Sequence, residues 1–184
     1  MRKLILIVGP WVLLSGSFAA EPITDENWVT NPQIAEIRSL YQKLQTERDR
    51  GKLLRKERRF DCSLAANDID YDSYEGDVRI LYNDRSGRPR IYYHEGGSED
   101  SAVRIELFYD ENGKLRFAYI RAGAVNGTKT EIRIYFSSAG TKIWNNERVV
   151  KGPGYPFVEW GLVDDPVQAF NGKSPCPEVV RKQK

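Results

Sequence analysis

Three similar segments follow one another along the chain, 26 and then 27 residues apart. Each contains a run of aromatic and β-branched residues, a four-residue turn that ends in glycine, and a second run of the same kind. The turns end at Gly87, Gly113 and Gly140. This pattern predicts three successive β-hairpins, and therefore a meandering antiparallel sheet of about six strands between about residues 66 and 150.

One amphipathic helix is predicted before the sheet, over about residues 31–50. Thr30 or Asn31 can cap its first amides, Pro32 suits its first turn, and Gly51 can adopt the left-handed conformation that ends a helix. Continuation of the helix through Gly51 to Arg58 is the alternative. Apolar residues recur at helical spacing, at Ile34, Ile37, Leu40, Tyr41 and Leu44.

The helix and the sheet together predict an α+β fold in which the helix covers one apolar face of the meander. Closure of the sheet into a small barrel is left open. Residues 21–184 are expected to form one globular domain. The prolines and glycines of residues 151–184 predict an irregular C-terminal segment.

The first 20 residues have the pattern of a cleaved signal peptide. Basic Arg2 and Lys3 precede an apolar run, and small residues up to Ala19 and Ala20 offer a cleavage site after either alanine. We therefore expect a periplasmic or secreted protein without a transmembrane anchor in its mature chain.

Charge argues against nucleic acid as a partner. The chain has 28 basic and 26 acidic residues, and loss of Arg2 and Lys3 with the signal leaves equal numbers. A local basic run is interpreted as a solvated face near the end of the helix, with an acidic partner as the alternative. It comprises Arg48, Arg50, Lys52, Arg55, Lys56, Arg58 and Arg59.

The two cysteines, Cys62 and Cys176, are predicted to form a disulfide in an oxidising compartment. The bond would fix the C-terminal tail to the rest of the domain. A redox pair is the alternative, but the spacing is not that of a C-x-x-C motif.

Motifs for catalysis are missing, so a non-catalytic protein without a cofactor is predicted. His94 is the single histidine, which excludes a multi-histidine metal site, and no G-x-S-x-G motif accompanies it. A hydrolase with an unrecognised pair of carboxylates remains an alternative. Asp68, Asp70 and Asp72 are a lesser candidate for calcium, since a strand with its carboxylates in water explains their alternation equally simply.

Aromatic residues beside glycine and proline are the candidate contact residues for a protein partner. Packing over the end of the sheet is the competing interpretation. We hypothesise an exported binding protein that uses loops at the sheet end to contact another envelope or secreted protein. A small-ligand carrier with an apolar cavity between helix and sheet is the alternative. The candidate contact residues are Tyr92, Tyr93, His94, Tyr155, Phe157 and Trp160.

Overall fold

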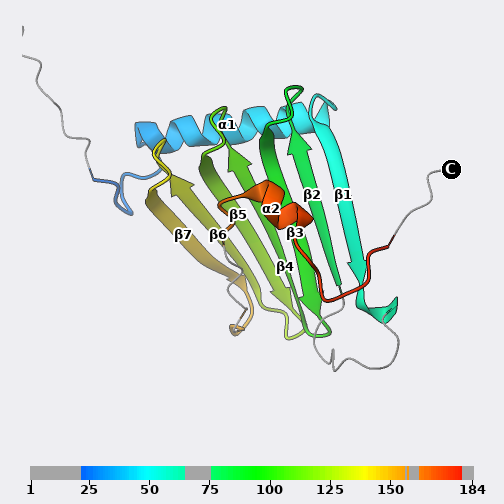
Figure 1. The fold of residues 1–184 in the computed structure, drawn as a ribbon. Coiled ribbons are helices and arrows are strands. Elements are labelled where there is room, and N and C mark those ends of the chain that lie inside the picture. The colour runs from blue at the N-terminus through cyan, green and yellow to red at the C-terminus, as the bar shows by residue number, and fades with distance from the viewer. Residues whose placement is uncertain (1–21, 65–75, 156, 158–161, 180–184) are drawn as a thin grey trace, which may run out of the picture.

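A computed structural model describes residues 22–64, 76–155, 157 and 162–179. It contains one long helix, a sheet and a second, short helix (Figure 1). In chain order these are α1 (Pro32–Asp49), β1 (Leu54–Asp61), a 3-10 turn (Cys62–Leu64), β2 (Gly76–Asn83), β3 (Pro89–Ser98), β4 (Ser101–Tyr109), β5 (Leu115–Ala124), β6 (Lys129–Phe136), β7 (Lys142–Lys151) and α2 (Pro166–Asn171).

The seven described strands form one antiparallel sheet in chain order, from β1 to β7. This confirms the meander but corrects the expected six strands to seven. The additional strand is β1, which the basic run after the helix forms by pairing with β2. A run of long charged side chains is typical of an edge strand as well as of a solvated helix face. The sequence of β1 was therefore not recognised as a strand. β1 and β7 are the two edges, so the sheet is open and not a barrel.

The three predicted hairpins are present as β2–β3, β4–β5 and β6–β7. Their turn glycines, Gly87, Gly113 and Gly140, all have positive φ angles, between 75° and 87°. In the second turn the Asp110 carboxylate accepts hydrogen bonds from the amides of Asn112 and Lys114, at 2.8 and 3.0 Å. Each hairpin therefore has its turn fixed by local chemistry, independently of the rest of the sheet.

Helix α1 begins and ends as the sequence predicts. The Asn31 side chain accepts hydrogen bonds from the amides of Gln33 and Ile34, and Gly51, with φ 66°, follows the last turn. The alternative continuation through Arg58 is excluded, because the chain enters β1 at Leu54.

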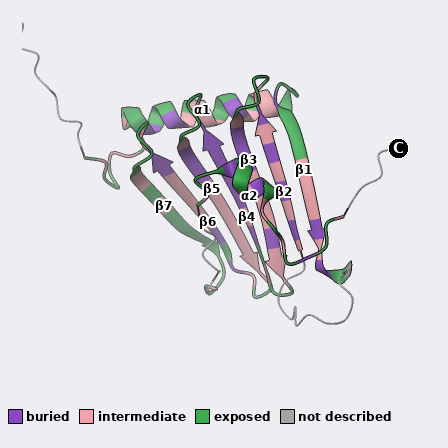
Figure 2. Cartoon of the chain, in the orientation of Figure 1, coloured by how far each residue is buried: buried purple, intermediate pink, exposed green. Residues whose placement is uncertain are grey.

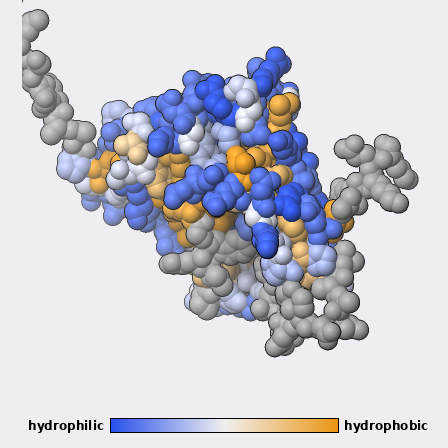
Figure 3. Space-filling model, in the orientation of Figure 1, coloured by the Kyte–Doolittle hydropathy of each residue, from blue (hydrophilic) through white to orange (hydrophobic). Residues whose placement is uncertain are grey.

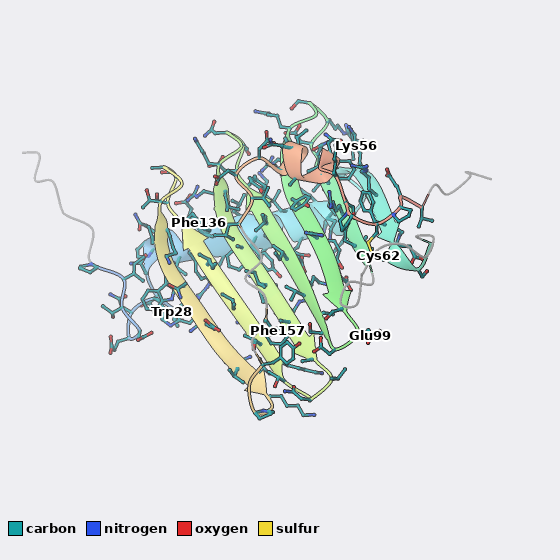
Figure 4. The ribbon with its side chains drawn as sticks, turned by 60° about the horizontal axis from the view of Figure 1, so that its bottom comes forward. Trp28, Lys56, Cys62, Glu99, Phe136 and Phe157 are labelled. Atoms are coloured by element: carbon teal, nitrogen blue, oxygen red, sulfur yellow. A yellow bond between two sulfur atoms is a disulfide. The ribbon has the colours of Figure 1, made fainter. Side chains whose placement is uncertain are left out.

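The two helices lie on opposite faces of the sheet (Figures 1 and 4). Helix α1 crosses the strands near the end at which the three hairpins turn. Buried side chains concentrate in the central strands, whereas β7 is largely exposed (Figure 2). On the α1 side the buried cluster includes Ile37, Phe108 and Phe117. On the α2 side it includes Leu107 and Phe170, and hydrophobic surface is visible beside α2 (Figure 3).

The C-terminal segment is more ordered than its prolines and glycines predict, because it contains α2. The Asp165 carboxylate caps this helix by accepting hydrogen bonds from the amides of Val167 and Gln168. Phe170 anchors it in the core. The predicted disulfide between Cys62 and Cys176 is confirmed and joins the end of β1 to the C-terminal segment (Figure 4).

Candidate functional site

Strand register arranges the α1 side of the sheet in rows that become more polar with distance from the helix. The first row, under α1, is apolar and runs from Ile91 through Phe108 and Phe117 to Tyr135. Two residues further along each strand, the second row contains Tyr93, Glu106, Tyr119 and Arg133. The third row contains Glu95, Arg104, Arg121, Glu131 and Arg148.

A groove runs between α1 and the second row. It consists of two cavities of about 400 and 270 Å³ that share Tyr41 and Tyr119 in their walls. We call it the helix–sheet groove. Its polar lining consists mainly of arginines and tyrosines, with two glutamines and one carboxylate: Arg38, Arg48, Arg104, Arg121, Arg133, Tyr41, Tyr82, Tyr93, Tyr119, Tyr135, Gln42, Gln45 and Glu106.

Glu106 links the helix and the sheet across this groove. Its side chain is 8% exposed, and Arg121 donates to it at 2.9 Å. From α1, Arg48 approaches it to 3.6 Å and Gln45 donates to it at 3.5 Å. These contacts hold one carboxylate between two arginines, and the groove lining has five arginines to this one glutamate.

The arginines of the sheet are held by stacking as well as by ion pairs. The guanidinium groups of Arg121 and Arg133 both lie over the Tyr119 ring, 5.2 and 5.0 Å from its centroid. Arg133 also donates to Glu131 at 2.8 Å, and Tyr119 donates to the same carboxylate at 3.0 Å. Guanidinium groups positioned in this way lose little freedom when they bind an anion.

Two acidic partners of the groove arginines, Glu95 and Glu131, remain ionised to low pH. Burial by itself would raise the pKa of Glu95, but hydrogen bonds from Tyr93 and Arg104 hold that pKa below its ordinary value. Burial by itself would also raise the pKa of Glu131. Hydrogen bonds from Arg133 and Tyr119 outweigh burial and lower that pKa. The ion pairs of Arg104 with Glu95 and of Arg133 with Glu131 are therefore intact at neutral pH.

The structure separates the three candidate residues of β3. Tyr92 is 2% exposed in the core on the α2 side, so it is not available to a partner. Tyr93 lies on the other face and lines the helix–sheet groove. His94 returns to the α2 side, where its Nε2 atom is 3.9 Å from Asp77 Oδ2. Neighbouring residues of a strand point to opposite faces, which is why one tripeptide cannot act as one surface.

The loop after β7 packs against the rest of the domain. The Tyr155 hydroxyl donates to Asp100 at 2.5 Å, and its ring centroid lies 4.8 Å from that of Phe157. Phe157 in turn packs against the core cluster on the α2 side (Figure 4). This placement favours the interpretation that the loop covers the end of the sheet. Trp160, the calcium candidates Asp68, Asp70 and Asp72, and the expected signal peptide lie outside the described residues.

The groove is not among the sites predicted from the sequence, although β3 to β6 contain a pattern that indicates it. Tyrosine, glutamate and arginine alternate with apolar residues there, as in Arg104, Glu106 and Tyr119, Arg121. Such alternation identifies a polar face of a sheet. It does not show that the polar residues of four strands form one groove, because that depends on register and on the position of α1.

Comparisons of the chain with models of protein families, with curated proteins and with solved structures find no match. Within the described residues, no helix is long and apolar enough to cross a membrane. The function is therefore inferred from the chemistry of the groove.

Proposed function

We propose that this protein is an exported, non-catalytic binding protein that holds an acidic segment of another envelope or secreted protein in the helix–sheet groove. The observation that carries the proposal is the lining of that groove, in which five arginines and five tyrosines surround a single glutamate. Arginine and tyrosine are the side chains most often responsible for binding energy at protein interfaces.

The tyrosines favour a protein segment over a bare inorganic ion. Their rings supply apolar contact area between the guanidinium groups, as where Tyr41 packs edge-on against Phe108 with ring centroids 4.9 Å apart. A ligand that alternates carboxylates with apolar groups matches both parts of this lining. The predicted partner thus remains a protein, but its contact site moves from the loops at the sheet end to the groove.

The disulfide supports the proposed location outside the cytoplasm. Cys62 and Cys176 are paired, and a structural disulfide that joins distant parts of a chain is typical of periplasmic and secreted proteins.

A carrier of a small anionic ligand is the second candidate function. The cavity of about 400 Å³ has the size of a small-molecule site. Its charged walls do not match the apolar cavity that is expected of a carrier from the sequence. Glu106 is the one carboxylate among the described residues that line the groove, so the hydrolase alternative gains no support from it.

The test is binding of a fluorescent peptide in which glutamate alternates with leucine, measured by anisotropy, with a glutamine-for-glutamate peptide as the comparison. We expect the acidic peptide to bind more tightly, and salt to weaken it. The variant Arg133→Gln should weaken binding about tenfold, because it removes one charge-assisted hydrogen bond from the groove.

Arg148→Gln is the matched control. Arg148 donates to the same Glu131 carboxylate, at 3.3 Å, but does not line the groove. It should change peptide binding by less than about twofold. Equal weakening by both substitutions would show general attraction to a basic surface and would rule out the groove as the site. Tight binding of a small anion without the peptide would favour the carrier.

A further inference from the structure

A second hollow lies on the α1 side, further from the helix than the groove. Gly97, Ala102 and Gly123 occupy adjacent positions on β3, β4 and β5, two residues beyond the third row. Ala102 and Gly123 line a hollow in the surface, which their small size leaves open. The hollow measures about 420 Å³, and its walls include Glu95, Arg104, Arg121 and Lys129.

Gly123 in the floor of this hollow is not required by the fold. Its φ is not positive, and an added Cβ atom would meet only the Thr128 carbonyl oxygen, at 3.9 Å. Gly97 differs, because a Cβ atom there would lie 2.5 Å from the Ser101 carbonyl oxygen. Glycine inside a strand lowers stability and often marks the close approach of a ligand. The fold therefore gives no steric reason for a glycine at position 123.

Two arginines directly oppose each other at the edge of the hollow. Arg104 pairs with Arg121 in the register of β4 and β5, and like charges in this position destabilise a sheet. The Nη2 atom of Arg104 donates to Glu95, its register partner on β3, at 2.7 Å. Arg121 donates to Glu106, in the second row on β4, at 2.9 Å. Neither carboxylate lies between the two arginines in the register.

Lys129 adds a third positive charge next to the floor, since it pairs with Gly123 in the register of β5 and β6. The hollow thus has three cations and one carboxylate in its walls. The side chains of Arg104 and Arg121 are 39% and 43% exposed, so a ligand can reach them from solvent.

We propose that this hollow binds a compact oxyanion, a carboxylate or phosphate group, between Arg104, Arg121 and Lys129, over the bare backbone of Gly123. The anion offsets the repulsion between the two opposed arginines and has room because Gly123 lacks a side chain. The site goes beyond the proposed function: it shares Arg104 and Arg121 with the helix–sheet groove but lies on their other side.

The test uses inorganic phosphate with the folded protein at constant ionic strength, and follows the backbone amide signals of Ala102, Gly123 and Lys129 by NMR. We expect these signals to shift in a saturable way. Lys129→Gln should weaken phosphate binding about fivefold, and Gly123→Leu, which fills the hollow and keeps every charge, should abolish it.

Arg148→Gln removes one charge from the same face outside the hollow and should change binding by less than about twofold. Arg133→Gln alters the groove only and should leave the phosphate response intact, so a failure of the groove is distinguishable from a failure of this site. Absence of saturable shifts, or equal weakening by Lys129→Gln and Arg148→Gln, would overturn the proposal.

The acidic peptide identifies the source of the anion. If it shifts the Gly123 signal and competes with phosphate, a carboxylate of the groove ligand occupies the hollow. If the two bind independently, the hollow takes a separate phosphate or carboxylate compound.

Discussion

Buried charged side chains fasten the C-terminal segment to the α2 side of the sheet. Arg79 donates to both oxygens of Asp77, at 3.1 and 3.0 Å, and to the carbonyl oxygen of Gly172, at 2.8 Å. Ser174 donates to Asp77 at 3.2 Å. Arg79 thus pairs with a carboxylate and also donates to backbone carbonyls at the end of α2. These carbonyls would otherwise need hydrogen bonds from water.

His94 gives this network a pH dependence. Burial lowers the pKa of His94 to about 4, with Asp77 opposing the shift and Arg79 adding to it. The unfolded chain takes up a proton near pH 6.5, before the folded protein does, so folding stability falls as the pH drops from about 6.5 through 4. The expected total loss is on the order of 3 kcal/mol.

Urea unfolding at pH 7 and pH 4.5 measures this effect. The loss of unfolding free energy between pH 7 and pH 4.5 should be smaller in His94→Gln than in the natural protein. Protonation of the carboxylates lowers the stability of both proteins equally. Identical losses would show that His94 does not control acid stability.

At the scale of the element, α1 depends on the sheet for its stability. Ile34, Ile37 and Leu44 are fully buried, whereas the opposite side of the helix is exposed. Tyr41 extends this contact by packing edge-on against Phe108 and Phe117 at 4.9 and 5.2 Å between ring centroids. A helix of 18 residues gains most of its stability from such packing.

Ile37→Ala tests this contact. We expect it to lower the free energy of unfolding by about 3 kcal/mol, because it leaves a cavity between α1 and the sheet. Ser39→Ala, on the exposed side of the same helix, should change it by less than about 0.5 kcal/mol. Chemical denaturation measures both; a loss below 1 kcal/mol, roughly, for Ile37→Ala would contradict the packing described for α1.

Across the whole molecule, the disulfide joins parts of the chain 114 residues apart. The C-terminal segment also adds to the edge of β1, where the Val179 amide donates to the Arg59 carbonyl at 2.8 Å. The C-terminal segment thus partly covers the β1 edge of the sheet, and the disulfide holds the segment there. Arg58 supports the same contact by donating to Glu178 at 2.8 Å.

Replacement of both Cys62 and Cys176 by serine should lower stability by up to about 4 to 5 kcal/mol, because the unfolded chain gains freedom when a long loop opens. Urea unfolding with and without a reducing agent measures the loss. Reductant should destabilise the natural protein and leave the double variant unchanged. Equal effects of reductant on both proteins would show that the disulfide is not the source of the difference.

Local signals in the sequence determined the helix, the three hairpins and the cysteine pairing. The caps of α1, and the turn glycines such as Gly113, act within a few residues of the chain, so their effects can be read from order and spacing alone. The cysteine pairing needed no geometry because the chain has only two cysteines. The charged strand β1 was not predicted, because an edge strand buries few side chains and so shows little apolar alternation.

Only the tertiary structure decided where a ligand can bind. Alternation along β3 predicts that Tyr92 and Tyr93 face opposite ways, but not which of them is buried and which lines a groove. Which tyrosine lines the groove depends on the position of α1. The helix lies near the hairpin turns and does not cover the second and third rows. The groove and the opposed pair Arg104 and Arg121 arise from register between strands, because residues far apart in sequence become neighbours only when the sheet forms.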